Sequence, residues 1–193
     1  MEFRSPVIDE IEAMTGPENI GLAYVYLDYK SHDEQSINNV LSSLLRQLMA
    51  RKDDAIPAIL GMYRHFFSGQ IAGCQDRPGA TSLLEGIALV STHFCSTFIV
   101  LDALDEFDEN LRSNLLDMVG KLIASVSSAK LYATSRPHLR SVQDFFEDFP
   151  RVEIRADIND IKNYLTKTIE GKVSRGTLRN TIIDKVSISA KGM

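Results

Sequence analysis

The fold is decided by one segment, Phe98-Ile99-Val100-Leu101-Asp102-Ala103-Leu104-Asp105-Glu106, in which an apolar run leads directly into three acids. The run from Thr97 to Leu101 is short, continuous and rich in β-branched and aromatic residues. This pattern predicts a strand that is covered on both faces, as in a parallel sheet. The acids then follow at the carboxyl end of the strand, where open α/β sheets bind their ligands. A carboxylate in that position can reach a magnesium ion directly or through water.

Predicted strands alternate with predicted helices on both sides of this segment. Apolar residues at helical spacing predict the helices, and short β-branched or aromatic runs predict the strands. The clearest helix follows Ser36, and Thr15-Gly16-Pro17 is expected to end the first one. The predicted helices cover residues 5–14, 36–48, 56–67, 83–90, 111–126, 139–146, 157–165 and 178–188, and the predicted strands cover 21–29, 97–101, 130–134 and 151–155. The alternation is typical of an α/β fold.

A second motif, Lys130-Leu131-Tyr132-Ala133-Thr134-Ser135-Arg136-Pro137-His138, also places polar residues after a predicted strand. Two hydroxyl residues, Thr134 and Ser135, are followed by Arg136 and a proline. A guanidinium group suits a phosphate-facing position because it stays charged and offers a planar fork of donors. The alternative reading is that Pro137 begins a helix and that Arg136 is simply solvated.

Length and composition fit one globular domain. The chain has 193 residues, of which 44% are hydrophobic and 24% charged, with a net charge of −5. Acids and bases are interspersed without a basic run, which argues against nucleic acid as the primary partner. No apolar segment approaches the ~18 residues that a membrane span needs. The first residues lack the basic and apolar regions of a signal peptide, so we expect a cytoplasmic protein.

Cysteine and histidine residues give no sign of a metal site. Cys74 and Cys95 have no metal-ligand spacing and are expected to be reduced thiols, as is usual in the cytosol. The four histidines are isolated from one another and are expected to be surface or helix-end residues: His32, His65, His93 and His138.

The segment at 98–106 resembles the Walker B motif of NACHT domains, which are P-loop NTPases of the STAND class, and it looks most like the fungal branch with a nephrocystin-like N-terminal domain. The resemblance implies that Asp102 serves the magnesium shell and that Asp105 and Glu106 orient or activate the attacking water. The alternative is a buried strand followed by an acidic turn that only caps the next helix.

The motif at 130–137 is similar to the sensor-one strand of the same domains, whose polar end faces the γ-phosphate. The resemblance implies that Thr134, Ser135 and Arg136 face a bound nucleotide, with ATP and Mg²⁺ as cofactors. It covers most of the chain and implies a partial domain over 1–193, with a three-layer parallel sheet flanked by helices. Such domains are signalling switches that oligomerise after nucleotide exchange.

The phosphate-binding loop of that family, G-x-x-x-x-G-K-[ST], does not occur in this sequence. Gly120-Lys121 is followed by Leu122, and Gly171-Lys172 by Val173. The resemblance implies that the loop and the first, central strand would precede Met1, that this strand would lie between the strands at 130 and 151, and that the domain is truncated at both ends. The loop supplies phosphate-cradling N–H groups, a lysine and a magnesium-binding hydroxyl. Without them we expect no ATP binding or hydrolysis by this chain alone.

Three functional classes follow from these observations. The first is an ATP-driven STAND switch domain of which this chain is an incomplete copy. The second is a non-enzymatic interaction module, a pseudo-NTPase remnant that associates with intact relatives or with itself. The third is an unrelated α/β hydrolase that uses the carboxylates with a metal, and it has the least support because no serine or histidine nucleophile motif accompanies the acids.

Overall fold

The chain forms two compact units, Met1–Asp148 and Phe149–Met193. The structure is a computed structural model, and it describes residues 6–31, 35–52, 57, 61, 78–154, 157–169 and 176–189. The first unit contains the segment that decides the fold, and the described residues of the second unit include two helices.

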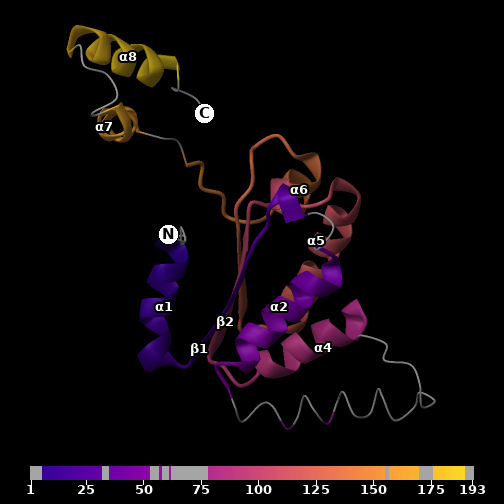
Figure 1. The fold of residues 1–193 in the computed structure, drawn as a ribbon. Coiled ribbons are helices and arrows are strands. Elements are labelled where there is room, and N and C mark those ends of the chain that lie inside the picture. Colours follow the sequence, from indigo (N-terminus) through magenta and orange to yellow (C-terminus); the bar gives the residue numbers. More distant parts are fainter. Residues whose placement is uncertain are drawn as a thin grey trace. The chain divides into compact units, whose positions relative to one another are not determined.

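A three-stranded parallel sheet forms the centre of the first unit (Figure 1). Its strands are β1 (Ile20–Tyr26), β2 (Ser96–Asp102) and β3 (Ala129–Ala133), and β2 lies between the other two. The register pairs Val100 with Tyr24 on one side and with Tyr132 on the other. The prediction of a parallel α/β sheet is therefore confirmed, with the apolar run at 97–101 as its middle strand.

Helices cover both faces of this sheet, which gives three layers (Figure 1). One face packs against α1 (Pro6–Glu18) through a small cluster that includes Ile8, Leu22 and Val100. The other face packs against α2 (Ile37–Met49), α4 (Ala80–Ser91) and α5 (Glu109–Ser125), and this larger cluster also takes in Val142 of α6 (Arg140–Phe145). Successive residues of β2 belong alternately to the larger and the smaller cluster, so the strand is buried on both sides.

Capping side chains fix where α2 and α5 begin. The Ser36 hydroxyl accepts a hydrogen bond from the Asn39 N–H at the start of α2. The Asp108 carboxylate accepts from the N–H groups of Asn110 and Leu111 at the start of α5. Both satisfy N–H groups that have no partner inside the helix. The cap of α5 matters for the site because it follows the acids directly in sequence.

A glutamine side chain binds one residue, Tyr24, on the outer edge of β1. The Tyr24 N–H donates to Gln47 Oε1 at 3.1 Å, and Gln47 Nε2 donates to the Tyr24 carbonyl oxygen at 2.7 Å. The amide of Gln47 thus takes the place that a neighbouring strand would fill. Exposed edges with unpaired main-chain groups promote association between chains, so this contact protects β1.

The first helix and strand differ from the sequence prediction at their ends. The helix α1 continues past Gly16 and Pro17 to Glu18, so the expected stop at Thr15 was wrong. Asn19 ends it instead, in the left-handed region with φ 50°, a conformation that asparagine tolerates better than most residues. The strand β1 ends at Tyr26 rather than at residue 29. The helix expected over 56–67 lies outside the described residues except for positions 57 and 61.

The second unit contains α7 (Ile158–Ile169) and α8 (Gly176–Ser189). Asp157 caps α7, because its carboxylate accepts from the Asn159 N–H at 2.7 Å. The strand predicted over 151–155 is wrong for the residues described there, since 151–154 have no regular structure. Val152 and Ile154 are 85% and 79% exposed. Alternating apolar residues suit a half-buried strand, but a strand also needs a partner for its main-chain groups, and no described segment pairs with these residues.

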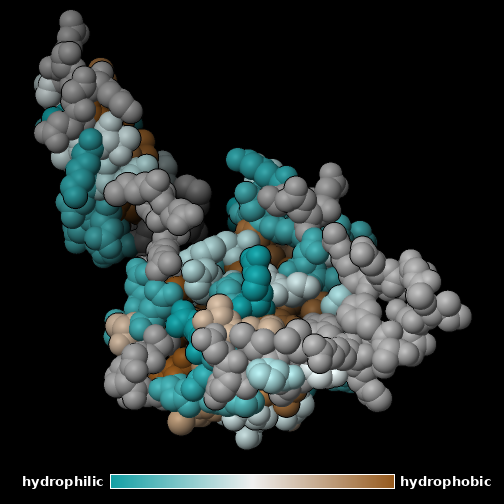
Figure 2. All heavy atoms as spheres, turned by 60° about the horizontal axis from the view of Figure 1, so that its bottom comes forward, coloured by the Kyte–Doolittle hydropathy of each residue, from teal (hydrophilic) through white to brown (hydrophobic). Residues whose placement is uncertain are grey.

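The described surface is mixed in character. On the face shown in Figure 2, hydrophilic residues in teal alternate with smaller hydrophobic areas in brown, and grey atoms hide part of the view. Among the described helices, none has both the length and the apolar character to cross a membrane.

Candidate functional site

The three acids of the deciding segment lie on a tight turn at the carboxyl end of β2. Asp102 is the last residue of the strand, and Ala103 then adopts the left-handed region with φ 59°. A short 3₁₀ helix, η3 (Leu104–Glu106), follows and leads through Phe107 and Asp108 into α5. A left-handed residue reverses the chain sharply. The turn therefore keeps Asp105 and Glu106 at the edge of the sheet instead of carrying them along a helix.

Thr134, directly after β3, ties this turn to the neighbouring strand. Its hydroxyl donates to Asp102 Oδ1 and accepts from the Ala103 N–H at 2.8 Å. Its main-chain oxygen accepts from the Leu104 N–H at 2.9 Å. The structure thus brings together two residues that the sequence placed at the ends of separate strands, because parallel neighbours end at the same edge.

Asp105 and Arg136 form an ion pair across the same edge. Arg136 Nε lies 3.0 Å from Asp105 Oδ2, and the Arg136 N–H donates to Asp105 Oδ1 at 3.3 Å. The Arg136 side chain is 77% exposed and that of Asp105 only 14%, so solvent screens the pair and its contribution to stability is at most about 1 kcal/mol. The Ser135 hydroxyl donates to the Arg136 carbonyl oxygen rather than to a carboxylate.

Glu106 points to a third partner. Its Oε2 accepts from the Tyr29 N–H at 3.3 Å, in the short 3₁₀ turn η1 (Tyr29–Ser31) that follows β1. The three acids therefore do not converge on one point. Asp102 contacts the end of β3, Asp105 contacts Arg136, and Glu106 contacts the segment after β1.

One residue at this edge was missed by the sequence analysis. Arg112, on the first turn of α5, is 4% exposed and donates to the carbonyl oxygens of Leu104, Asp105 and Phe107. A signal for it was present in the sequence: Arg112 precedes Leu115, Leu116 and Val119 at helical spacing, so it falls on the buried face of the helix.

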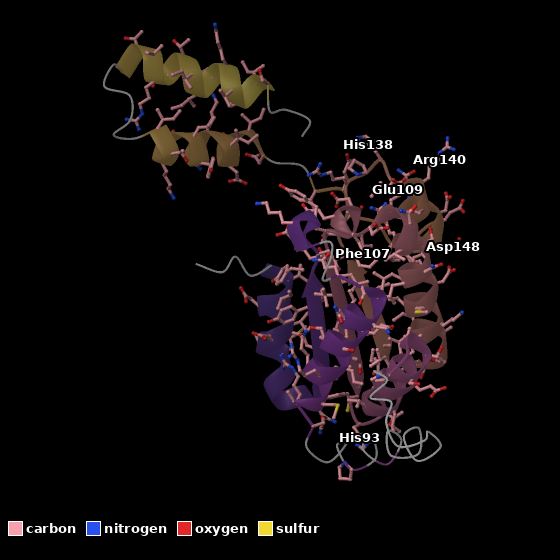
Figure 3. The ribbon with its side chains drawn as sticks, turned by 45° about the vertical axis from the view of Figure 1, so that its right-hand side comes forward. His93, Phe107, Glu109, His138, Arg140 and Asp148 are labelled. Carbon is pink, nitrogen blue, oxygen red and sulfur yellow. The ribbon has the colours of Figure 1, made fainter. Side chains whose placement is uncertain are left out.

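A shallow hollow of about 540 Å³ borders the acidic turn, which comprises residues 103–107. It is lined by Tyr29, residues 105–110, Arg112 and Arg136, which include four acids and two arginines. The lining is therefore acidic by two formal charges. Figure 3 shows Phe107 and Glu109 at this end of the first unit together with His138 and Arg140, whereas His93 lies at the opposite end. The two histidines thus do not share a site.

The residues present do not by themselves fit a magnesium nucleotide. One oxygen of Asp102 is engaged by Thr134, and Asp105 is paired with Arg136. Magnesium in nucleotide sites takes one or two carboxylates plus substrate phosphates, and the acidic lining offers phosphates no counterpart to the cradle of a G-x-x-x-x-G-K-[ST] loop.

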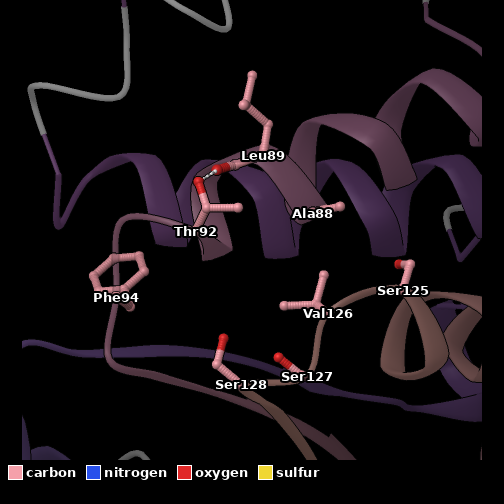
Figure 4. A pocket seen from close by; sticks show the side chains of 8 residues that line it. All are labelled: Ala88, Leu89, Thr92, Phe94, Ser125, Val126, Ser127 and Ser128. Atoms are coloured by element: carbon pink, nitrogen blue, oxygen red, sulfur yellow. Dashed lines mark hydrogen bonds between the residues drawn. The ribbon is translucent and has the colours of Figure 1, made fainter.

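A second hollow lies at the amino ends of the strands and offers no comparable chemistry (Figure 4). It is lined by Ala88, Leu89, Thr92, Phe94 and residues 125–128, none of which is charged. The hydroxyls of Thr92 and Ser125 already donate to the carbonyl oxygens of Leu89 and Leu122. The carboxyl end of the sheet is therefore the better candidate site.

Comparison with known protein families identifies the chain's family. The sequence profile of the family described as nephrocystin 3, N-terminal, matches residues 4–136. The matched part contains all three strands, the acidic turn and Arg136 at its last position. Among curated proteins, none matches the chain. Because the match spans more than half of the sequence, the chain belongs to the nephrocystin 3 N-terminal family.

Proposed function

We propose that this chain is part of the NTPase domain of a NACHT-type STAND switch, of the fungal nephrocystin-like type, and that it neither binds nor hydrolyses ATP by itself. In this proposal residues 98–106 are a Walker B segment and residues 130–137 a sensor-one segment. Asp102 would belong to the magnesium shell, Asp105 and Glu106 to the water-activating acids, and Arg136, Ser135 and Thr134 to the phosphate-facing edge.

The observation that carries the proposal is the meeting of the two motifs at one sheet edge. Thr134 bonds to Asp102, and Arg136 pairs with Asp105, although about thirty residues separate each pair in sequence. The carboxyl edge of a parallel sheet is the usual ligand-binding edge of such folds. The family match over residues 4–136 supports the same assignment.

The lack of activity follows from charge and positioning. Phosphoryl transfer depends almost entirely on holding the phosphates and neutralising their charge. Here the acids outnumber the arginines around the hollow, and Arg136 is already paired with Asp105. A triphosphate approaching this edge would meet net repulsion, so the acids alone cannot assemble a site.

A titration with ATP and Mg²⁺ tests the inactive half of the proposal. We expect no saturable heat of binding by calorimetry and no rise in melting temperature, although a ligand at 100 times its Kd would stabilise the fold by about 2.7 kcal/mol. Saturable binding would contradict the proposal. If Asp102→Asn abolished that binding, the site would be the acidic edge, and if not, it would be elsewhere.

A chimaera tests the other half. A strand and a G-x-x-x-x-G-K-[ST] loop taken from an intact relative would be joined before Met1. We expect the chimaera to bind Mg²⁺-ATP and Asp102→Asn to abolish the binding. Binding that Asp102→Asn leaves unchanged would remove the assignment of this edge as a Walker B segment.

The second unit favours a second candidate function, an interaction module that associates with intact relatives. Its described residues include no buried hydrophobic side chain, and Tyr164, Leu178 and Ile188 are well exposed. A single exposed apolar residue is ordinary on a protein surface, whereas several of them together indicate a contact surface. Co-purification with a full-length relative tests this candidate, and failure of the two proteins to associate at micromolar concentration would contradict it.

A further inference from the structure

We propose that Arg112 is a positioning residue for the acidic turn, residues 103–107. Its guanidinium group holds the main chain of the turn, and so determines where the Asp105 carboxylate stands and whether it reaches Arg136. That this turn faces a nucleotide rests on the proposed function, whereas its positioning by Arg112 does not.

The hydrogen bonds of the Arg112 side chain are all with the turn. Nε donates to the Leu104 carbonyl oxygen at 2.8 Å, and Nη2 donates to those of Asp105 at 3.1 Å and Phe107 at 2.6 Å. A planar guanidinium carries five N–H donors in a fixed fork, so one side chain can bind several carbonyls at once. The three acceptors span four consecutive residues, which leaves this part of the turn little freedom.

The burial of Arg112 is costly and therefore informative. At 4% exposure it is the one buried charged side chain among the described residues. Within that part of the chain its hydrogen-bond partners are main-chain oxygens rather than a carboxylate. A buried charge is unfavourable unless its donors are satisfied. An apolar residue would fill the same position on α5 without that cost, so packing alone does not explain an arginine here.

The turn needs support at both of its ends. Ala103 has φ 59°, a region that a residue with a Cβ adopts only under constraint. Thr134 holds the first part, through the N–H groups of Ala103 and Leu104. Arg112 holds the second part, including the carbonyl of Asp105 itself. If the second support were lost, the Asp105 side chain could rotate away from Arg136.

Hydrogen exchange and NMR of the whole chain can test this. In Arg112→Met we expect the Glu106 and Phe107 amides to exchange about tenfold faster or more, because a charged donor with three acceptors is removed. We also expect the Arg136 Nε–H signal to move to the position of an unpaired guanidinium. Arg112→Lys should give an intermediate result, since an ammonium cannot span the three carbonyls.

Leu116→Ala is the matched control, because Leu116 is 2% exposed on the same helix and does not bond to the turn. It should lower the melting temperature without a selective effect on the Glu106 amide or on Arg136. If Arg112→Met changed both readouts no more than this control does, Arg112 would be an ordinary packing residue and the proposal would be wrong. Should Arg112→Met not fold, the same comparison with Arg112→Lys decides. ATP binding by the wild-type chain bears only on the proposed function, so the two failures are distinguishable.

Discussion

At the scale of single residues, Thr134 links the two motifs of the candidate site. Its hydroxyl both donates to Asp102 and accepts from the Ala103 N–H. Without the hydroxyl, a half-buried carboxylate oxygen and a main-chain N–H would both lose their partner. The cost of leaving such groups unpaired exceeds the modest net value of the bonds themselves.

We therefore expect Thr134→Val, which keeps the shape of the side chain, to lower the free energy of unfolding by about 1–3 kcal/mol. Urea unfolding followed by circular dichroism measures this as a lower midpoint with an unchanged slope. Thr134→Ser is the control and should lose less than about 0.5 kcal/mol, since it keeps the hydroxyl. If Thr134→Val lost no more stability than Thr134→Ser, the hydroxyl would contribute no more than the methyl group, and the prediction would be wrong.

The residues of this edge were predictable to different degrees. Asp102 and Thr134 were predictable as neighbours because parallel strands end at a common edge. The pairing of Asp105 with Arg136 was not, because it depends on the left-handed Ala103, and alanine gives no sign of that conformation. Arg112 carried a signal in its helical spacing, but charged residues are so often solvated that the spacing alone did not identify it.

At the scale of elements, Gln47 binds the outer edge of β1, which is an edge strand of the sheet. Its amide bonds to both main-chain groups of Tyr24. We expect Gln47→Leu to leave these groups unpaired and to lower the free energy of unfolding by about 1–3 kcal/mol. Sedimentation velocity should also show more association, because the edge is then open.

Ser43→Ala is the matched change for this test. It removes the hydroxyl to which Gln47 Nε2 donates at 3.3 Å but leaves both bonds to Tyr24. It should alter the free energy of unfolding by less than about 0.5 kcal/mol. A Gln47→Leu variant as stable and as monomeric as Ser43→Ala would mean that water satisfies the edge equally well.

Elements with a local signal were predicted well, and those that depend on distant partners were not. The continuous apolar run of β2 and the repeated leucines of α2 each carry their own pattern, so both were found. The residues at 151–154 carry the alternation of a strand, yet Val152 and Ile154 are exposed. No local pattern states whether a neighbouring strand exists. The same holds for Pro17, which lowers helix propensity but did not stop α1.

At the scale of the whole molecule, the two units differ in how fully their described apolar side chains are buried. Every buried hydrophobic side chain among the described residues lies within Met1–Asp148. The described part of Phe149–Met193 has Ser187 as its one buried residue, and polar contacts such as Lys162 with Asp184 link its two helices. An exposed ion pair contributes little to stability. Isolated helices of 12 and 14 residues are marginal in water.

We therefore expect the two units to differ strongly in local stability. In hydrogen exchange of the full chain, the amides of β2 and α5 should exchange only when the first unit unfolds. The amides of α7 and α8 should exchange at least roughly a hundredfold faster. In urea, the helix signal should fall in two steps, the smaller one first, because two-state behaviour fails when units unfold separately. Equal protection of α7 and β2 would contradict this expectation. It would mean that α7 and α8 are held together by more than exposed polar contacts, since such contacts contribute little to stability.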